Sequence, residues 1–400
     1  MATKRKSTEE AQNGGKPKRK AFGEITNVAN KTSQQDVGKQ GLKNQVKKGL
    51  NSFVERGKTS LRSSLRRKNA KKEETVTSSS SNSSSSEEAL VCVMETSGSS
   101  TEVEETEVIQ TVFVCPDPPR VIPPEGVDDF DGEHLGDVFQ HSEYVLETFD
   151  YYKKREETFA VGDYIDEQME ITRTMRGILV DWLVEVQESF ELNHETLYTA
   201  VKATDIYLSK KQAKKEDLQL IGATACFIAC KIDERIPPLL DDFLYVCDDA
   251  YTRDQIIRME RKMLSVIGFD MGYSLSYRYI RRYGRVCKIK MPVLTLGRYI
   301  LETALMEYSL NVNTSESKLA AAAMVLAMKM MDVKGYKATL EWYSGHKLEE
   351  LSPLVNDLLK MLKKPTSDQT QTIKNKYSHR VFHEVAKLPI PDAVDASSDQ

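Results

Sequence analysis

The chain has 400 residues and a formal net charge of −4, a length that leaves room for two domains beside unfolded sequence. Its six cysteines follow no zinc spacing and no dense disulfide framework, and its start, MATKRKSTEE, contains no apolar signal core. No window approaches the roughly 18 uninterrupted apolar residues of a transmembrane helix. These features predict neither a dense disulfide framework nor a transmembrane helix, and they predict a reducing compartment, either the cytosol or the nucleus.

The near-neutral net charge conceals two segments of opposite sign. Residues 1–72 contain 20 Lys and Arg against 5 Asp and Glu, whereas residues 73–150 contain 1 Arg against 19 Asp and Glu. Residues 1–125 are also poor in large apolar side chains, and the run TSSSSNSSSSEE at 77–88 cannot offset the entropy of ordering. We predict a disordered regulatory tail over 1–125. The strand-like VIQTVFV at 108–114 is isolated within it and is at best a short docking segment.

Helical periodicity begins near residue 134, after a Pro-rich linker at 116–126. The segment TRTMRGILVDWLVEVQESF at 172–190 is apolar around much of its circumference, so we expect a central and largely buried helix. Further helices are predicted at 143–157, 194–208, 216–234 and 252–267. Pro237 and Pro238 follow the third of these and prevent it from continuing.

A second helical unit is predicted over about 274–388, with helices at 292–309, 315–331, 348–364 and 373–386. It contains a short internal echo of the first unit. ATACFIACK at 223–231 aligns without a gap with AAAMVLAMK at 321–329, so that small residues coincide and Lys231 matches Lys329. Small residues allow close helix approach, which predicts that each of these two helices is the centre of its own bundle.

Catalytic signatures are missing from the sequence. We find no glycine-rich phosphate loop, no nucleophile elbow and no metal-ligand spacing. His379 and His383 are four residues apart on the last predicted helix, but no Cys or carboxylate motif accompanies them. Cys226 and Cys230 are predicted to be buried thiols in an apolar helix. We therefore expect a binding protein without catalysis, cofactor or metal.

The segment MRGILVDWLVEV at 175–186 closely resembles the opening of the cyclin box, M-R-A-I-L-V-D-W-L. The resemblance continues in order through ETLYTAVKATDIYL, LQLIGATACFIACKIDERIPP, DDAYTRDQIIRMERKMLSVIGFD and NKYSHRVFHEVAKLP. It is most similar to the mitotic B-type cyclins, and it implies two stacked five-helix domains that bind and activate a cyclin-dependent kinase. The implied organisation is a linker and N-terminal helix at 126–170, cyclin boxes at 171–272 and 273–390, and a disordered end at 391–400.

Arg176 and Asp205 match the ion pair that ties the first helix of the cyclin box to the second. A charge in a mostly apolar helix needs a partner, so we expect this pair to be structural. Leu220 matches an apolar core position.

Lys231 and Glu260 match the two charged residues with which cyclins hold a mobile helical segment of the kinase. Lys donates to exposed carbonyl oxygens and Glu accepts from exposed amides, so together they fix an irregular segment. The alternative is that Lys231 offsets a helix C-terminus and that Glu260 is a solvated charge. The apolar surroundings are matched by Ile228, Ile232, Leu264 and Phe269, with Ile232 standing where an aromatic is common.

The resemblance also implies a shallow substrate-docking groove, matched by Met175, Ile178, Leu179, Trp182, Glu185 and Gln219. An apolar strip flanked by polar groups suits a short basic-x-leucine peptide. The alternative, that these residues are simply core, stays open. Gly177 stands where the motif usually has Ala, which predicts a looser backbone at this point.

RKAFGEITN at 19–27 resembles the destruction box R-x-x-L-x-x-x-x-N, with Arg19, Phe22 and Asn27 at its fixed positions. The third branch of B-type cyclins uses phenylalanine in place of leucine at this position, so the chain most resembles that branch. The overlapping KPKRK predicts nuclear import and hence a nuclear location, through Lys16, Lys18, Arg19 and Lys20. The alternative for this cluster, and for LRRKNAKK at 65–72, is nonspecific binding of polyanions.

The implied role is a regulatory subunit that controls cell-cycle progression and is not itself an enzyme. Its expected partners are a cyclin-dependent kinase catalytic subunit, kinase substrates with short docking motifs, and a ubiquitin ligase that reads the destruction box. We expect no membrane and no specific nucleic acid. Competing readings are a helical scaffold and a cyclin-fold transcription factor. The latter predicts a basic helical body and an N-terminal zinc ribbon, which the sequence lacks.

Overall fold

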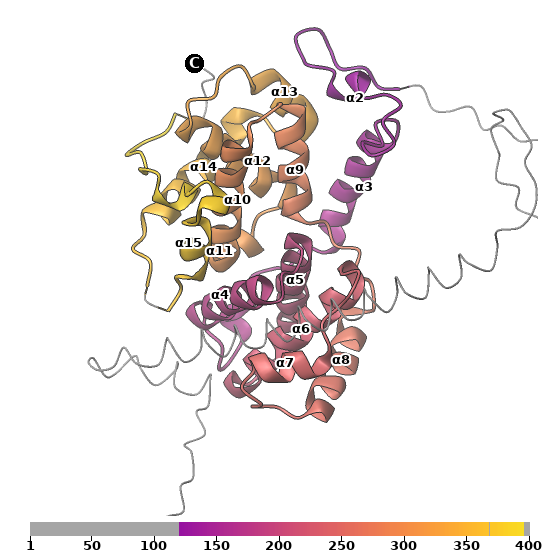
Figure 1. The fold of residues 1–400 in the computed structure, drawn as a ribbon, viewed down its shortest axis with the longest axis vertical. Helices are drawn as coiled ribbons and strands as arrows, with labels where there is room; N and C mark the ends of the chain where they lie inside the picture. Colours follow the sequence, from indigo (N-terminus) through magenta and orange to yellow (C-terminus); the bar gives the residue numbers. More distant parts are fainter. Residues whose placement is uncertain (1–119, 368, 396–400) are drawn as a thin grey trace, which may run out of the picture. The chain divides into compact units, whose positions relative to one another are not determined.

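A computed structural model describes residues 120–367 and 369–395, which consist of α-helices, short 3₁₀ turns and loops without a strand. The predicted all-α fold is thus confirmed (Figure 1). The predicted destruction box, nuclear-import cluster and strand-like segment all lie outside the described residues. Within the described range, no helix has the length and apolar character needed to cross a membrane.

Within the described range, α2 (Phe130–Glu133) and α3 (Val145–Thr158) precede the main body. The short helix α2 is held by a buried ion pair. Asp131 accepts two hydrogen bonds from Arg282, at 2.7 and 2.5 Å, and both side chains are buried. A small apolar cluster of Phe130, Val286 and Tyr343 lies beside this pair.

Consecutive residues of α3 contact two different parts of the body. Arg155 donates through Nη2 to Asp270 Oδ1 at 2.6 Å and to the carbonyl oxygen of Gly272 at 3.4 Å. Glu156 accepts from the backbone N–H of Ser317 at 2.7 Å and from its hydroxyl at 2.9 Å. Helix α3 therefore connects the segment after α8 with the start of α12.

The first helical half is a bundle in which capping signals mark the starts of α4 and α8 and the end of α8. Thr172 accepts from the N–H of Met175 at the start of α4, and Thr252 with Gln255 forms a capping box at the start of α8. Gly268 ends α8 in the left-handed conformation with φ 95°. The helices of this first half are α4 (Arg173–Ser189), α5 (His194–Lys210), α6 (Leu218–Asp233), α7 (Leu240–Val246) and α8 (Arg253–Ile267).

The second helical half contains five helices of eight or more residues and two shorter ones among the described residues. In chain order its helices are α9 (Ser276–Val286), α10 (Met291–Met306), α11 (Tyr308–Val312), α12 (Glu316–Met330), α13 (Lys337–Ser344), α14 (Leu348–Lys363) and α15 (Thr372–Tyr377). Two 3₁₀ turns follow, η4 (Arg380–Phe382) and η5 (Val385–Lys387). Figure 1 shows α12 surrounded by α9, α10 and α14.

The two helices that share the small-residue echo are central in their halves. Every residue of α6 from Leu218 to Cys230 is buried, and α6 packs against α4, α5 and α8. In α12, Ala320 through Met328 have no exposed surface. Methyl-sized side chains let neighbouring helix backbones approach closely, so the prediction drawn from the echo is confirmed.

Several helix predictions differ from the structure. Helices α7, α9 and α13 were not predicted. They are short, or the side chains they bury are aromatic residues and arginine instead of an aliphatic stripe. The predicted helix 292–309 breaks at Glu307. The predicted helix 373–386 ends at Tyr377, and His383 has a left-handed backbone with φ 55°. His379 and His383 therefore do not share a helical face.

Gly177 marks a close contact rather than a loose backbone. A Cβ atom added there would lie 3.3 Å from the carbonyl oxygen of Met306, at the end of α10. Helix α4 thus approaches the second helical half closely at this point. The glycine is explained by tight packing, which corrects the prediction of looseness.

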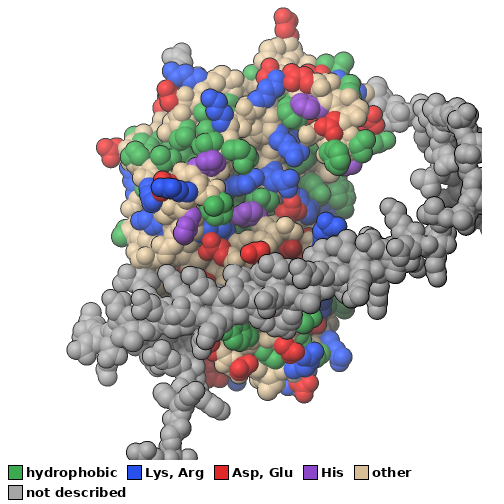
Figure 2. Space-filling view, in the orientation of Figure 1, with side chains coloured by type: hydrophobic (Ala, Val, Ile, Leu, Met, Phe, Trp, Pro, Cys, Tyr) green, Lys and Arg blue, Asp and Glu red, His purple; other side chains and the backbone are tan. Residues whose placement is uncertain are grey.

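Acidic and basic side chains are mixed on the visible face of the described body, as Figure 2 shows. Many of them form exposed ion pairs, such as Arg253 with Asp241 at 2.5 Å and Lys337 with Glu349 at 2.8 Å. Such pairs contribute little to stability.

Candidate functional site

One groove on the first helical half is lined by all six residues for which the cyclin-box resemblance implied a role in kinase binding. It has a volume of about 490 Å³. The six are Ile228, Lys231, Ile232, Glu260, Leu264 and Phe269. Residues not predicted for this site also line the groove, namely Thr199, Asp233, Met271, Gly272, Tyr273, Leu275 and Arg278.

Lys231 and Glu260 form an ion pair with each other across α6 and α8. The Lys231 Nζ also lies 4.4 Å from the centre of the Phe227 ring, in cation–π contact. Partial burial lowers the pKa of Lys231. The side chain of Lys231 is 41% exposed and that of Glu260 14%, so a partner can reach both groups from solvent.

The apolar part of the groove combines a buried floor with two exposed side chains. Ile228 is buried, whereas Ile232 is 50% and Phe269 70% exposed. Phe269 follows Gly268, and both have left-handed backbones, with φ 63° and 95°. Their N–H groups donate to the carbonyl oxygen of Leu264, which ends α8 and turns Phe269 outward. A bulky residue with positive φ is strained and is typical of functional sites.

The predicted ion pair of Arg176 and Asp205 is buried in the core between α4 and α5. Arg176 donates through Nε to Asp205 Oδ1 at 3.0 Å and through Nη2 to Oδ2 at 2.6 Å, and each side chain is at most 2% exposed. Tyr164 donates its hydroxyl to Asp205 Oδ1 at 2.7 Å. Burial opposes the charge on Arg176, but the attraction of Asp205 outweighs it and raises the arginine pKa.

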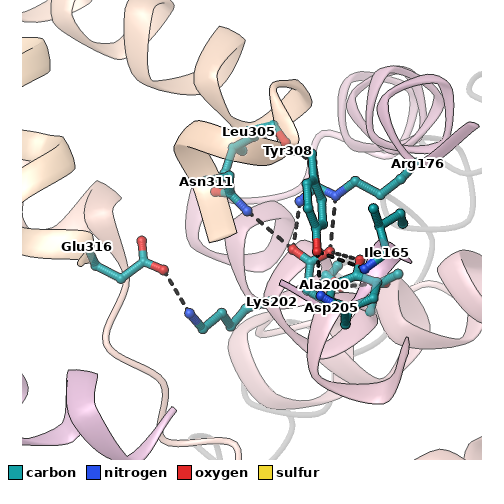
Figure 3. A network of polar contacts seen from close by, with 11 residues as sticks. Ile165, Arg176, Ala200, Lys202, Asp205, Leu305, Tyr308, Asn311 and Glu316 are labelled. Carbon is teal, nitrogen blue, oxygen red and sulfur yellow. Dashed lines mark hydrogen bonds and ion pairs between the residues drawn. The ribbon is translucent and has the colours of Figure 1, made fainter. Parts of the chain in front are cut away.

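This ion pair belongs to a network that extends into the second helical half (Figure 3). The carbonyl oxygen of Leu305 accepts from Arg176, and the side-chain amide of Asn311 donates to Asp205 at 3.2 Å. The Tyr308 hydroxyl accepts from the backbone N–H groups of Tyr164 and Ile165 at 2.7 and 3.0 Å. The sequence motif indicated the pair but gave no signal for these partners, which lie more than 100 positions along the chain.

A second buried network fixes α15 to the rest of the body. Glu302 and Lys376 are each 1% exposed and are joined at 2.5 Å. Lys376 also donates to Gln187 at 2.8 Å, and the Tyr377 hydroxyl donates to Glu302 at 2.9 Å. Burial acts to raise the pKa of Glu302, but Lys376 and His194 lower it to about 2.

The predicted docking strip is partly exposed and partly core. Met175, Ile178, Trp182 and Glu185 are each partly exposed along α4. Leu179 has no exposed surface and Gln219 is 2% exposed. These two residues support the strip from within and are not available to contact a peptide, which corrects the prediction for them. Leu220 is buried, as expected of a core position.

Asp181 lies on the same helix and caps the start of α15. It accepts from the N–H of Thr372 at 3.1 Å and from its hydroxyl at 2.7 Å. Burial raises the pKa of Asp181 to about 6, although these hydrogen bonds act to lower it. Among the described residues, no group of three His, Cys, Asp or Glu side chains is arranged to hold a metal.

Family models provide the identification. The model of the cyclin N-terminal domain matches residues 147–272, and that of the cyclin C-terminal domain matches residues 274–391. The chain belongs to the cyclin family. The groove and both buried networks lie largely within these two matches, and the assignment to a regulatory family bears out the expectation that this cyclin is not itself an enzyme.

Curated relatives place this cyclin in the B3 branch. It is 50% identical to the G2/mitotic-specific cyclin-B3 of Drosophila melanogaster over 68% of this chain, but the match spans about half, 49%, of that protein. It is 41% identical to the cyclin-B3 of Gallus gallus over 94% of this chain and 85% of the relative. Among solved structures, a viral cyclin from herpesvirus saimiri aligns over 58% of this chain and 99% of its own, with TM-score 0.48 and 23% identity.

Proposed function

We propose that this cyclin binds and activates a cyclin-dependent protein kinase, and that it does so through the groove of α6 and α8. The observation that carries the proposal is that all six matched residues line one groove, with the Lys231–Glu260 pair beside exposed apolar side chains. Exposed Ile232 and Phe269 suit an apolar anchor on the partner. The lysine and the glutamate suit the unpaired carbonyl and N–H groups of an irregular backbone segment.

The mechanism that follows is allosteric. A protein kinase positions nucleotide phosphates only when its own Lys–Glu ion pair is assembled, which requires a mobile helix to be in place. A partner that binds that helix position better than the alternative shifts the population toward it. Here Lys231 and Glu260 exchange their contact with each other for contacts with the kinase. The phosphoryl transfer itself stays in the kinase.

A charge-swap variant tests the proposal without removing the ion pair. Lys231→Glu combined with Glu260→Lys keeps an internal pair but presents reversed charges to the kinase. We expect the swap to abolish kinase binding and activation while thermal unfolding stays close to wild type. The matched control swaps Lys337 and Glu349, an exposed pair of the second helical half, and is expected to bind as wild type does.

Two results would contradict the proposal in different ways. Normal activation by the Lys231/Glu260 swap would remove these residues from the interface. Absence of kinase binding by the wild-type chain, tested by pull-down with purified catalytic subunits, would overturn the function as a whole.

We further propose that the chain acts in cell division in the nucleus and is destroyed through its tail. Support comes from the destruction-box resemblance, the basic cluster that overlaps it, and relatives named as G2/mitotic-specific. Phe22→Ala separates the two tail functions, because a basic import signal does not need an aromatic residue. We expect Phe22→Ala to persist past mitotic exit and to enter the nucleus normally. Loss of nuclear entry together with normal destruction would contradict the assignment.

Substrate docking on the strip of α4 is a further part of the proposed function. The partly exposed Met175, Ile178 and Trp182 suit the leucine of a short peptide, and Glu185 suits its basic residue. Trp182→Ala is expected to reduce phosphorylation of a substrate that carries such a motif, while a substrate without the motif is phosphorylated at the wild-type rate. Equal loss for both substrates would show that the variant acts through folding.

A further inference from the structure

The groove has a second polar region that the family resemblance did not indicate. It is formed by Thr199, Asp233 and Arg278. Arg278 belongs to α9, so the second helical half contributes a cation to a groove otherwise built mainly on the first. Its side chain is 28% exposed.

Contacts from two other helices fix the orientation of the Arg278 guanidinium. Its Nε donates to Glu195 Oε2 of α5 at 2.9 Å, and its Nη1 donates to the hydroxyl of Tyr152 of α3 at 3.3 Å. The guanidinium carbon lies 5.3 Å from the centre of the Tyr152 ring. Within the described part of the chain, no hydrogen bond uses Nη2 of Arg278. A guanidinium held in place with a donor to spare is preorganised for a partner's acceptor, because little side-chain entropy is then lost on binding.

The neighbouring charges indicate what kind of acceptor fits. Glu195 also accepts from Arg281 at 3.1 Å, and Asp233 accepts from the Thr199 hydroxyl at 3.1 Å. Two arginines and two carboxylates therefore sum to zero formal charge around this region. An added carboxylate would leave an excess of negative charge there, whereas a neutral oxygen would not.

We propose that Arg278 is a second anchor for the kinase segment, with Nη2 donating to a main-chain carbonyl oxygen of the segment that enters the groove. This inference rests on the proposed function, and it deepens it by making kinase binding depend on both helical halves. Main-chain carbonyls are left without partners where a helix ends or becomes irregular, which is the kind of segment that the Lys231–Glu260 pair suits.

A pair of matched variants tests the inference. Arg278→Met removes the guanidinium donors but keeps a long apolar side chain. Arg281→Met is the control, because Arg281 also donates to Glu195 but does not line the groove. A hydrogen bond from a charged group predicts that Arg278→Met weakens the affinity for a kinase that wild type binds by about tenfold or more. Arg281→Met is expected to stay within about threefold of wild type. Affinity is measured by calorimetry on full-length proteins, with thermal unfolding as the folding control.

Each outcome decides a separate point. Equal losses for the two variants, or an Arg278→Met affinity within threefold of wild type, would overturn the anchor. A loss for Arg278→Met that disappears as salt is raised from 0.05 to about 0.5 M would overturn the neutral acceptor in favour of a carboxylate. Failure of the wild-type chain to bind kinase would contradict the proposed function and is read independently of both variants.

Discussion

Asn311 of the second helical half donates to the same Asp205 carboxylate that neutralises Arg176 in the first, at a distance of 3.2 Å. The carboxylate therefore belongs to both halves. Arg176 is anchored in the same way, because the carbonyl oxygen of Leu305 accepts from it. An ion pair expected to tie two neighbouring helices also ties the two cyclin domains together.

Removal of Arg176 should destabilise the protein strongly. Arg176→Ala leaves Asp205 buried without its cation, which predicts a loss of about 3–5 kcal/mol in the free energy of unfolding. The measurement is equilibrium urea unfolding of the purified chain. Arg173→Ala is the control on the same helix, since its ion pair with Asp166 is exposed, and it should change stability by less than about 1 kcal/mol. Similar effects of the two variants would contradict a structural role for the buried pair.

The hydroxyl of Tyr308 should contribute measurably to the free energy of unfolding. Tyr308→Phe leaves the buried N–H groups of Tyr164 and Ile165 without their acceptor, and the expected cost is about 1–3 kcal/mol in the free energy of unfolding. Tyr144→Phe, at an exposed position, is the matched control and should be neutral. Equal stability of Tyr308→Phe and wild type would show that another acceptor replaces the hydroxyl.

The raised pKa of Asp181 predicts that this residue favours folding more at mildly acidic than at neutral pH. Its folded pKa of about 6 lies above the usual value of 3.8, so the folded state binds a proton more readily than the unfolded state. The contribution of Asp181 to stability therefore increases as pH falls from about 7 to about 4. Asp181→Asn should remove this dependence.

The measurement for Asp181 is the difference in free energy of unfolding between wild type and Asp181→Asn at several pH values. The difference should change by on the order of 2 kcal/mol between pH 7 and pH 4, in favour of wild type at the lower pH. A difference that does not vary with pH would contradict the assignment of the titration to this carboxyl.

Glu302 predicts the opposite slope in a more acidic window. Its folded pKa of about 2 lies below the usual 4.5, so its stabilising contribution is complete above about pH 4.5 and is lost as pH falls toward 2. Glu302→Gln should lose this acid sensitivity. At pH 7 it should be destabilised by about 3–5 kcal/mol, because Lys376 is left buried without its anion.

Acid titration of tertiary structure by near-ultraviolet circular dichroism, with urea unfolding at pH 7, measures both effects of Glu302→Gln. Glu307→Gln is the control, because Glu307 pairs with Lys364 on the surface. An unchanged acid transition in Glu302→Gln would place the acid-sensitive group elsewhere.

Aliphatic periodicity decided which helices the sequence could predict. Helices α4, α5, α6 and α8 carry continuous apolar faces and were placed within about two residues of their observed ends. Helix α9, SYRYIRRYGRV, buries Arg282 and three tyrosines. The burial of Arg282 depends on its ion pair with Asp131, which lies 151 positions away in the chain. A local pattern cannot reveal a buried arginine whose partner is that distant.

The candidate site, like the fold, could be predicted from the sequence only in part. Family resemblance brought together the six groove residues, but burial decided that Leu179 and Gln219 of the docking strip face inward. Neighbours on one helix differ in exposure according to which other helix covers them, and a motif does not contain that information. No sequence motif marks Arg278, which lines the groove because of how α9 packs.

The adjacent residues Arg155 and Glu156 give α3 the role of a splint. One holds the rim of the groove through Gly272, and the other holds the start of α12 through Ser317. A fragment that begins at residue 160 keeps α4 to α15 and the contacts of Tyr164 and Ile165 with Tyr308, but it lacks this splint and the Tyr152 contact of Arg278. We expect such a fragment to fold and to present its groove in a less rigid form, so truncation would lower the proposed kinase affinity although no residue of α6 or α8 is changed.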